Sequence, residues 1–481
     1  MDEMKKGRGS VFHAVAAFSS VLCLLALFLT FSATAAEGSD SRREVPAEEI
    51  LTKIKMSGPA DYENVSIVGS FDLTDMFIDS DIKIRNSRVD ELNFTSSSFS
   101  KPVEFANCTI RGQADLSRAK FLDAASFEDS TFEQNASFSE AEFGDAIFKN
   151  ARFPGISDFD YAKFGGYTCF SGADLTNSSF SEAEFKGPAE FGSSRFNGTA
   201  NFLKAHFFDL TNFKGADFGG DASFASTKFD DVAAFTSARF QDNASFKLAR
   251  FARATHFGAT NFTKDAIFQL SAFDNLAYFI GARFGGNLDL MGSKIFNIKL
   301  ENTTFAKGSE ITLKDADFTK FQTHWSHINK YLAYDGAAYL RLVKNYKDLE
   351  WFSDSDDCYY QYRIESQALK SWGSSKIVDI LACTTCGYGV RPIQPIICSV
   401  ILILGCTTVF WMGNGLRHST NKEKRTSLYD ALYYCLAIFF TIPLPDLKPA
   451  GRYRYVPVIL RAIAWTLFAL LIATLGKVMI R

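Results

Sequence analysis

The chain has 481 residues, a formal net charge of −3 and 49 phenylalanines. A chain of this length predicts several domains. Charges of both signs are interspersed, without the basic stripe of a nucleic-acid-binding protein, so we expect no nucleic acid among its partners. The sequence also lacks a phosphate loop, a dinucleotide fingerprint, a zinc-protease helix and a nucleophile elbow. We therefore expect no enzyme activity, no cofactor and no metal site.

Residues 1–36 have the pattern of a secretory signal. Basic residues between positions 5 and 8 precede an apolar run that includes residues 21–29, and the small residues Ala33-Thr34-Ala35 follow it. This order of basic, apolar and small residues is typical of a signal peptide, and the run is also long enough for an uncleaved signal-anchor. Both alternatives place the following chain on the exoplasmic side of the cell membrane. Residues 37–65 are expected to form an N-terminal cap or linker.

A phenylalanine repeat dominates the next part of the chain. Between Phe185 and Phe284 a phenylalanine returns every eleventh residue, and a second series from Phe191 to Phe279 divides each interval into six and five. Such steps would scatter the aromatic side chains around an α-helix and alternate them between the two faces of a flat strand. The spacing instead predicts a coil that turns a corner every five or six residues. Four sides give about 22 residues per coil, with coils stacked about 4.8 Å apart.

The repeat units resemble those of pentapeptide-repeat proteins, and the resemblance covers roughly residues 66–320. It rests on the units Ala125-Ser126-Phe127, Ala136-Ser137-Phe138, Ala141-Glu142-Phe143, Ala151-Arg152-Phe153 and Ala173-Asp174-Leu175. The resemblance implies an all-β fold, a right-handed quadrilateral β-helix or solenoid. This sequence departs from the family in using Phe where Leu is commoner and in adding a sixth residue at alternate corners. That departure suggests a wider coil.

Nine Asn-x-Ser/Thr glycosylation acceptors lie in or next to the repeat. They are Asn64, Asn93, Asn107, Asn135, Asn177, Asn197, Asn243, Asn261 and Asn302. Glycosylation is one interpretation, and the other is that polar corners rich in Asn, Ser and Thr generate the motif by chance. Cys108 and Cys169 are about three coils apart, too far for a disulfide, so we expect both to pack inward as small residues.

A helical connector is predicted over residues 321–375. Two amphipathic helices are expected around residues 339–346 and 359–365, the second capped by Asp354 or Asp356. The acidic cluster here lacks the glycine and the closing glutamate of a calcium-binding loop, which favours capping over calcium.

Two short motifs, one in the connector and one in the juxtamembrane segment after it, could bind a metal. His324 and His327 could face one ion, but no third ligand accompanies them, so a structural or capping role is favoured. Cys383 and Cys386 form a single C-x-x-C, which cannot make a four-ligand zinc site. The juxtamembrane segment 376–392 also contains Thr385-Cys386-Gly387-Tyr388-Gly389, for which we predict a turn.

Two apolar spans follow, at residues 393–412 and 456–475. Each has about 20 residues, enough to cross a hydrocarbon layer about 30 Å thick, so two transmembrane helices are predicted within a module at residues 393–481. Arg461 is the charged residue inside the second span, and we expect its side chain to extend toward the interface.

The segment between the spans resembles the pore region of two-helix potassium-channel modules, over roughly residues 390–480. Residues 429–441 look like a pore helix. The segment after it stands where that family carries its T-V-G-Y-G-D filter, and it reads Thr441, Ile442, Pro443, Leu444, Pro445, Asp446. Pro443 and Pro445 occupy both glycine positions, and proline fixes φ near about −65°. A filter that aims consecutive carbonyls at the ion is therefore not expected, nor is selective potassium conduction.

Charge asymmetry predicts that the loop between the spans is cytoplasmic. Fewer basic residues lie on the other side, where Lys376 and Arg391 precede the first span and Lys477 and Arg481 follow the second. The basic residues of the loop are Arg417, Lys422, Lys424, Arg425, Lys448, Arg452 and Arg454. This orientation agrees with an exported repeat domain. It is the reverse of the usual orientation of a two-helix potassium-channel module, whose filter loop lies outside the cell.

Two functions are compatible with these features. The first is a multi-pass cell-membrane protein whose exoplasmic repeat domain is a non-enzymatic interaction or scaffold module on a channel-like anchor. The second is an ion channel of low or unconventional selectivity, with the repeat domain as an external sensor or vestibule and Asp446 in a ring of carboxylates in a tetramer. The expected partners are the membrane, other copies of the chain, and an extracellular protein or glycan.

Overall fold

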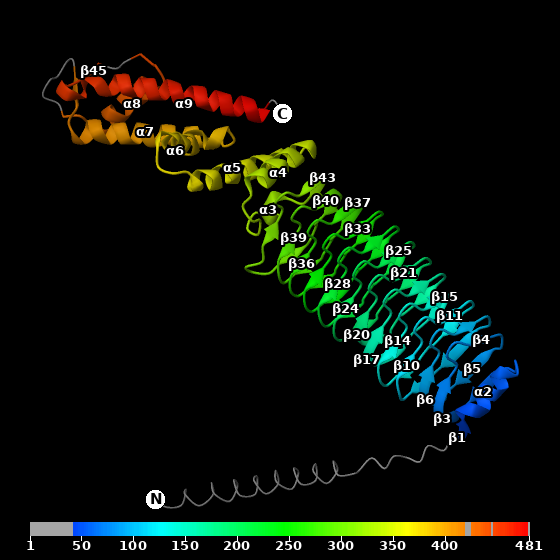
Figure 1. Cartoon of the computed structure of the whole chain (residues 1–481). Coiled ribbons are helices and arrows are strands. Elements are labelled where there is room, and N and C mark those ends of the chain that lie inside the picture. Colours follow the sequence, from blue (N-terminus) through cyan, green and yellow to red (C-terminus); the bar gives the residue numbers. More distant parts are fainter. Residues whose placement is uncertain (1–41, 419–424, 444–445, 480–481) are drawn as a thin grey trace, which may run out of the picture.

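The computed structural model describes residues 42–418, 425–443 and 446–479, so the predicted signal lies outside the described residues. An elongated β-solenoid precedes a group of helices (Figure 1). The described α-helices are α2 (Ala47–Lys55), α3 (Trp325–Ile328), α4 (Gly336–Asp348), α5 (Phe352–Leu369), α6 (Ser374–Cys386), α7 (Ile393–Met412), α8 (Leu428–Phe439) and α9 (Val456–Met479).

Each coil of the solenoid has four short sides. One coil consists of β11 (Lys120–Phe121), β12 (Ala125–Ser126), β13 (Thr131–Phe132) and β14 (Ala136–Ser137). The next coil begins with β15 (Glu142–Phe143), which pairs in parallel with β11. Strands of the first two sides form one sheet, and strands of the other two sides form a second sheet. Over much of the length the paired residues are 22 positions apart, as in Phe196 and Phe218, which confirms the predicted coil.

The core of the solenoid consists of axial stacks of phenylalanine rings. Along one stack the ring centroids of Phe180, Phe202 and Phe224 are 4.8 Å apart at each step, with interplanar angles of 1° and 2°. Rings on neighbouring sides meet edge to face, as for Phe202 and Phe213 at 5.4 Å and 86°. These are favoured geometries for aromatic pairs. Small residues such as Ala222 are buried beside the rings, as predicted.

Two rows of corners use the left-handed backbone conformation. In one row, Asn86, Asn107, Asp129 and Asn150 have φ values of 52°, 51°, 56° and 54°. The Asn107 amide donates to Asn86 Oδ1 at 2.8 Å, and the Asn150 amide donates to Asp129 Oδ1 at 3.0 Å. Asn and Asp tolerate this conformation because their short polar side chains can form local hydrogen bonds. In this first part of the row, side-chain hydrogen bonds therefore join neighbouring coils in pairs.

The N-terminal end of the solenoid is covered by a helix. β1 (Arg43–Pro46) pairs in parallel with β3 (Val65–Asp72), and β2 (Ala60–Glu63) pairs with β5 (Ile82–Arg85). Strand pairing thus begins at Arg43, ahead of the phenylalanine repeat. Between these strands, α2 buries Ala47, Ile50 and Ile54 and covers the first coil.

At the other end, α4 packs on the last strand, β43 (Asp317–Gln322). The buried Asn345 of α4 donates from Nδ2 to Phe321 O and accepts at Oδ1 from Phe321 N, both at 2.9 Å. The side chain of Asp335 caps α4 by accepting from Ala338 N at 2.8 Å. This pairing fixes the helix to the end of the solenoid.

The predicted caps of the second connector helix are wrong. α5 has Trp351 at its N-cap and no side-chain cap, because the indole of tryptophan can donate a hydrogen bond but cannot accept one. Asp354 lies in its first turn and accepts hydrogen bonds from Trp325 N and His324 Nδ1, both at 2.9 Å. The carboxylate therefore joins α5 to α3. His327 has a different partner, the hydroxyl of Thr303 at 3.0 Å, so the two histidines do not converge.

The prediction holds for Cys108, which is 1% exposed within the core, and in part for Cys169, which is also buried, at 5% exposed, but lies outside the core cluster. Cys169 pairs in register with Ile147 and Glu190, and both of these residues occupy the outward position of their strands. The three-residue unit places only its first and third side chains inward, and Cys169 is the middle residue.

Candidate functional site

The C-terminal helices form a compact module in which α8 packs between α7 and α9 (Figure 1). α8 begins with a capping box, in which Ser427 Oγ accepts from Tyr429 N and the Asp430 carboxylate accepts from Ser427 N, both at 3.3 Å. Such a box gives hydrogen-bond acceptors to backbone N–H groups at the start of the helix, here those of Ser427 and Tyr429. The predicted pore helix is thus helical from Leu428 to Phe439.

Aromatic packing holds α8 in place. Phe410 of α7 is fully buried and meets Tyr434 of α8 edge to face, with ring centroids 5.5 Å apart. Ile438 of α8 and Leu460 of α9 belong to the same buried cluster. The outward surfaces of α7 and α9 are apolar, and the segments Ile393–Met412 and Gly451–Lys477 are long and apolar enough to cross a membrane.

The filter-like segment begins as a helix-terminating turn. Thr441 has a φ of 56°, and its N–H donates to Ile438 O at 3.4 Å. The N–H of Ile442 donates to Ala437 O at 2.9 Å. This is the Schellman pattern, in which a left-handed residue closes a helix, with threonine in the position that glycine usually takes. Leu444 and Pro445 lie outside the described residues, and Asp446 beyond them is exposed.

A two-stranded clamp closes the base of this loop. β44 (Leu416–His418) pairs antiparallel with β45 (Leu447–Pro449). The hydroxyl of Thr426, just before α8, donates to Leu416 O at 3.1 Å. Leu416 and Leu447 are buried in this clamp. The clamp therefore joins the end of α7, the start of α8 and the approach to α9.

An apolar hollow of about 250 Å³ lies between the C-terminal end of α8 and α9. Its lining residues are Phe439, Phe440, Thr441, Ala464, Trp465 and Phe468. The lining contains no ionisable side chain, so the hollow offers neither acid–base chemistry nor ligands for a metal.

Comparison with known families agrees with both halves of this architecture. A family model described as pentapeptide repeats (9 copies) matches residues 84–131, 94–142, 116–163, 127–173 and 170–217. A family model described as ion channel matches residues 397–481. The chain contains pentapeptide repeats and a C-terminal ion-channel domain. No curated protein and no solved structure matches it.

The ion-channel domain is fastened to the pentapeptide-repeat solenoid through α5 and α6. Lys477, in the last turn of α9, has its Nζ 5.3 Å from the ring centroid of Tyr359 in α5. The Arg363 guanidinium donates to the Tyr359 hydroxyl at 3.1 Å and lies 4.4 Å from the ring centroid of Tyr388. These cation–π contacts join the end of α9 to the helix that packs on α4. The two domains are therefore joined by side-chain contacts as well as by the chain itself.

A buried carboxylate completes this junction. Asp379 of α6 is 6% exposed and accepts from Arg363 at 2.7 Å and from Lys370. The Lys370 ammonium, assisted by the Arg363 guanidinium, holds the pKa of Asp379 below its usual range. The carboxylate is therefore charged at neutral pH and links α5, the segment after it and α6.

The glycine-rich sequence before α7 is a turn, as predicted. Gly387, Tyr388 and Gly389 have φ values of 54°, 56° and 76° and separate α6 from α7. The side chain of Tyr388 is buried against Arg363, and its hydroxyl donates to Gln367 Oε1 at 3.3 Å. This sequence therefore belongs to the junction and lies apart from the loop between the spans.

The nine acceptor asparagines lie on the surface of the solenoid. Asn93, Asn243 and Asn261 are half-buried. The exposed ones are Asn64, Asn107, Asn135, Asn177, Asn197 and Asn302. Several of their side chains already hold neighbouring coils together, as when the Asn243 amide donates to Asp221 at 3.2 Å.

Two features of the site escape sequence reasoning. The helix-closing role of Thr441 has no composition signal, because glycine is the residue expected there. The group of Arg363, Asp379 and Lys477 is spread over more than a hundred residues, and only the fold brings it together. The run of tyrosines and arginine at 359–363 was the one local hint.

Proposed function

We propose that this protein is a membrane-anchored, exoplasmic pentapeptide-repeat scaffold, and that its ion-channel domain serves as an anchor without selective conduction. The observation that carries the proposal is the filter-like segment. Its first two residues, Thr441 and Ile442, use their N–H groups to close α8. Pro443 and Pro445 replace the two residues whose flexibility a carbonyl-lined filter needs. The scaffold binds an extracellular protein or glycan through its exposed rows of side chains.

Single-channel recording in planar bilayers under potassium and sodium gradients tests this proposal. The parent protein is expected to be silent, and so is an Asp446→Asn variant. A Pro443→Gly/Pro445→Gly variant reports whether the prolines alone prevent conduction. Reproducible unitary currents from the parent protein that disappear in the Asp446→Asn variant would overturn the proposal.

A second candidate function is an ion channel of low or unconventional selectivity, with the solenoid as an external sensor or vestibule. The contact between Lys477 and Tyr359 supports it, because it offers a path from the solenoid to α9. In a tetramer the exposed Asp446 would form a ring of carboxylates near the ion path. Changing Asp446 then alters conductance, which the same recordings measure.

Exoplasmic placement also leads us to propose that some of the exposed acceptors are glycosylated. Asn64 and Asn302 stand at left-handed corners, where a side chain projects away from the coil. Protein from a glycosylating host is expected to run faster on a gel after endoglycosidase treatment. An unchanged mobility would favour chance occurrence of the motif.

A further inference from the structure

A row of exposed arginines runs along the third side of the solenoid. Strand register places Arg152, Arg195, Arg239 and Arg283 at one outward position, in every second coil. The coils between them carry Asp174, Asp217 and Asn261 at that position. Since neighbouring coils are about 4.8 Å apart, the guanidinium groups recur about every 10 Å. We call these four arginines the arginine row.

The carboxylates between these arginines are engaged by other side chains. The Asn197 amide donates to Asp174, and the Gln241 amide donates to Asp217 at 2.8 Å. Within the described residues, no side-chain hydrogen bond or ion pair engages the guanidinium groups of the arginine row. The positive charge of the row is therefore free for a group outside the chain.

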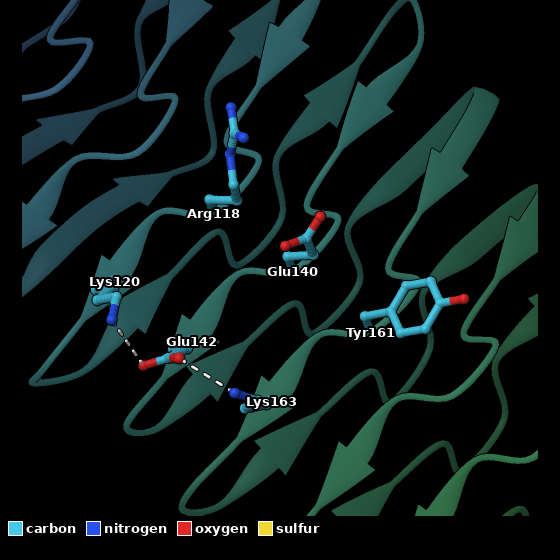
Figure 2. A pocket seen from close by; sticks show the side chains of 6 residues that line it. All are labelled: Arg118, Lys120, Glu140, Glu142, Tyr161 and Lys163. Carbon is cyan, nitrogen blue, oxygen red and sulfur yellow. Dashed lines mark hydrogen bonds and ion pairs between the residues drawn. The ribbon is translucent and has the colours of Figure 1, made fainter.

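The opposite side of the solenoid shows the contrasting arrangement. There the carboxylate of Glu142 lies 3.5 Å from Lys120 Nζ and 3.3 Å from Lys163 Nζ, so each lysine faces an acid in the neighbouring coil (Figure 2). Further along, Arg250 Nε lies 2.8 Å from Asp274. On that side, alternating charges in neighbouring coils form ion pairs within the chain. The unpaired state of the arginine row is therefore not a general consequence of the repeat.

The arginine row borders an open, polar trough. A hollow of about 840 Å³ is lined by Asn86, Asn107, Asp129, Thr131, Asn150, Arg152, Gly172, Asp174 and Arg195. In the following coils, the corner two residues before the row carries only small side chains. These are Ser193, Gly215, Ser237, Ala259 and Gly281. A chain laid along the solenoid axis would therefore meet amides, carboxylates and guanidinium groups without obstruction.

We propose that the arginine row binds a linear acidic polysaccharide lying along the solenoid axis. Guanidinium groups bind carboxylate or sulfate through two parallel hydrogen bonds. In a polysaccharide in which every second sugar is acidic, neighbouring charges are separated by the length of two sugar rings. This spacing is similar to the height of two coils. The phosphates of duplex DNA follow one another every 3.4 Å or so along each strand and do not match this repeat. The inference rests on the proposed exoplasmic placement, where such polymers occur.

Binding of the full chain in detergent to chondroitin sulfate, measured by calorimetry, tests the inference. Neutral dextran and a single-stranded oligonucleotide are the comparison probes. The test variant is Arg152→Ser/Arg195→Ser/Arg239→Ser/Arg283→Ser. The matched control, Lys120→Ser/Lys163→Ser/Lys228→Ser/Arg250→Ser, removes the same charge from the opposite side. We expect the parent to bind chondroitin sulfate, the test variant to lose at least about tenfold in affinity and the control to lose less than about twofold.

Equal losses in the two variants, absence of binding by the parent, or equal binding of dextran or the oligonucleotide would overturn the inference. Both variants change only exposed residues, and unchanged melting temperatures confirm that they are folded. The outcome is separable from the proposed function. A parent that conducts ions and still binds chondroitin sulfate through the arginine row refutes the silent anchor alone, whereas a silent parent without binding refutes the polysaccharide site alone.

Discussion

Each inward phenylalanine is held by rings above, below and beside it. Phe224 is fully buried, lies 4.8 Å from Phe202 and 4.9 Å from Phe246 in its stack, and meets Phe213 and Phe235 edge to face at 5.4 Å. Loss of one ring therefore removes contacts in three coils. The cavity cannot close, because strand pairing fixes the spacing of the coils.

We predict that Phe224→Ala lowers the free energy of unfolding by about 3–5 kcal/mol, the usual effect of removing a buried aromatic side chain. Phe224→Asp should be worse, since it also buries an unpaired charge. Urea titration followed by circular dichroism measures both. The outward neighbour Ser223→Ala is the control, with a change within about 0.5 kcal/mol. A Phe224→Asp variant that melts like the parent would refute the inward assignment.

The charge of Asp379 makes the junction sensitive to acid. Because Lys370 and Arg363 lower its pKa in the folded state, its stabilising contribution is present above the unfolded pKa of about 3.9 and is lost as the pH falls below it. Asp379→Asn should therefore melt below the parent at pH 6, and the difference should shrink toward pH 3. The exposed Asp348→Asn is the control. A difference that does not change with pH would contradict the ionic role of Asp379.

Asn345 of α4 hydrogen-bonds to the backbone of the last coil, as does Arg341, whose guanidinium donates to Ala316 O. Asn345 satisfies both backbone groups of Phe321, for which the described residues show no other partner on the side that faces α4. Asn345→Ala leaves a buried N–H and a buried C=O without partners, at a cost of about 1–3 kcal/mol for each group. We expect faster hydrogen exchange in β43 and α4 and unchanged exchange in the middle coils.

The exposed Lys344→Ala is the matched control for this element, one residue away on the same helix. If the Asn345→Ala variant showed faster hydrogen exchange uniformly along the whole solenoid, the C-terminal end of the solenoid would not unfold as a separate unit. Nearest-neighbour stability in repeat proteins predicts the local response.

The elements of the solenoid were predictable because one spacing repeats. Steps of five and six residues fit a coil with a corner at each step, and four sides give the 22-residue register in which Phe196 and Phe218 pair. The two ends of the solenoid were harder to predict from the sequence. β1 and β2 carry Val45 and Tyr62 at the positions where later coils have phenylalanine, so the repeat gives no sign of these strands.

The caps and the site were harder to predict for physical reasons. Asp354 has the residue type and place of a cap, but His324 and Trp325 compete for its carboxylate through tertiary contacts. The prolines of the filter-like segment were visible in the sequence. Its closure onto α8 through Thr441 was not, because that depends on where the helix ends in three dimensions.

At the scale of the whole molecule, the solenoid and the loop between the spans lie at opposite ends of α7 and α9. α7 begins and α9 ends beside α5 and α6, as the contact between Lys477 and Tyr359 requires. β44 and β45 lie at the far end (Figure 1). A membrane crossed by both helices therefore separates Asp446 from the solenoid, whichever way the protein is inserted. An exoplasmic solenoid then requires a cytoplasmic loop, which is also what the basic residues of the loop predict.

Cysteine labelling with a membrane-impermeant maleimide tests this orientation. Ser70→Cys, on the exposed surface of the solenoid, should react in intact cells. Asp446→Cys should react only after permeabilisation, because the basic loop is retained inside. The parent chain sets the background from its own cysteines. The reverse pattern would place the solenoid in the cytoplasm and remove the basis for an extracellular ligand, whereas labelling of both sites in intact cells would contradict a membrane crossed by α7 and α9.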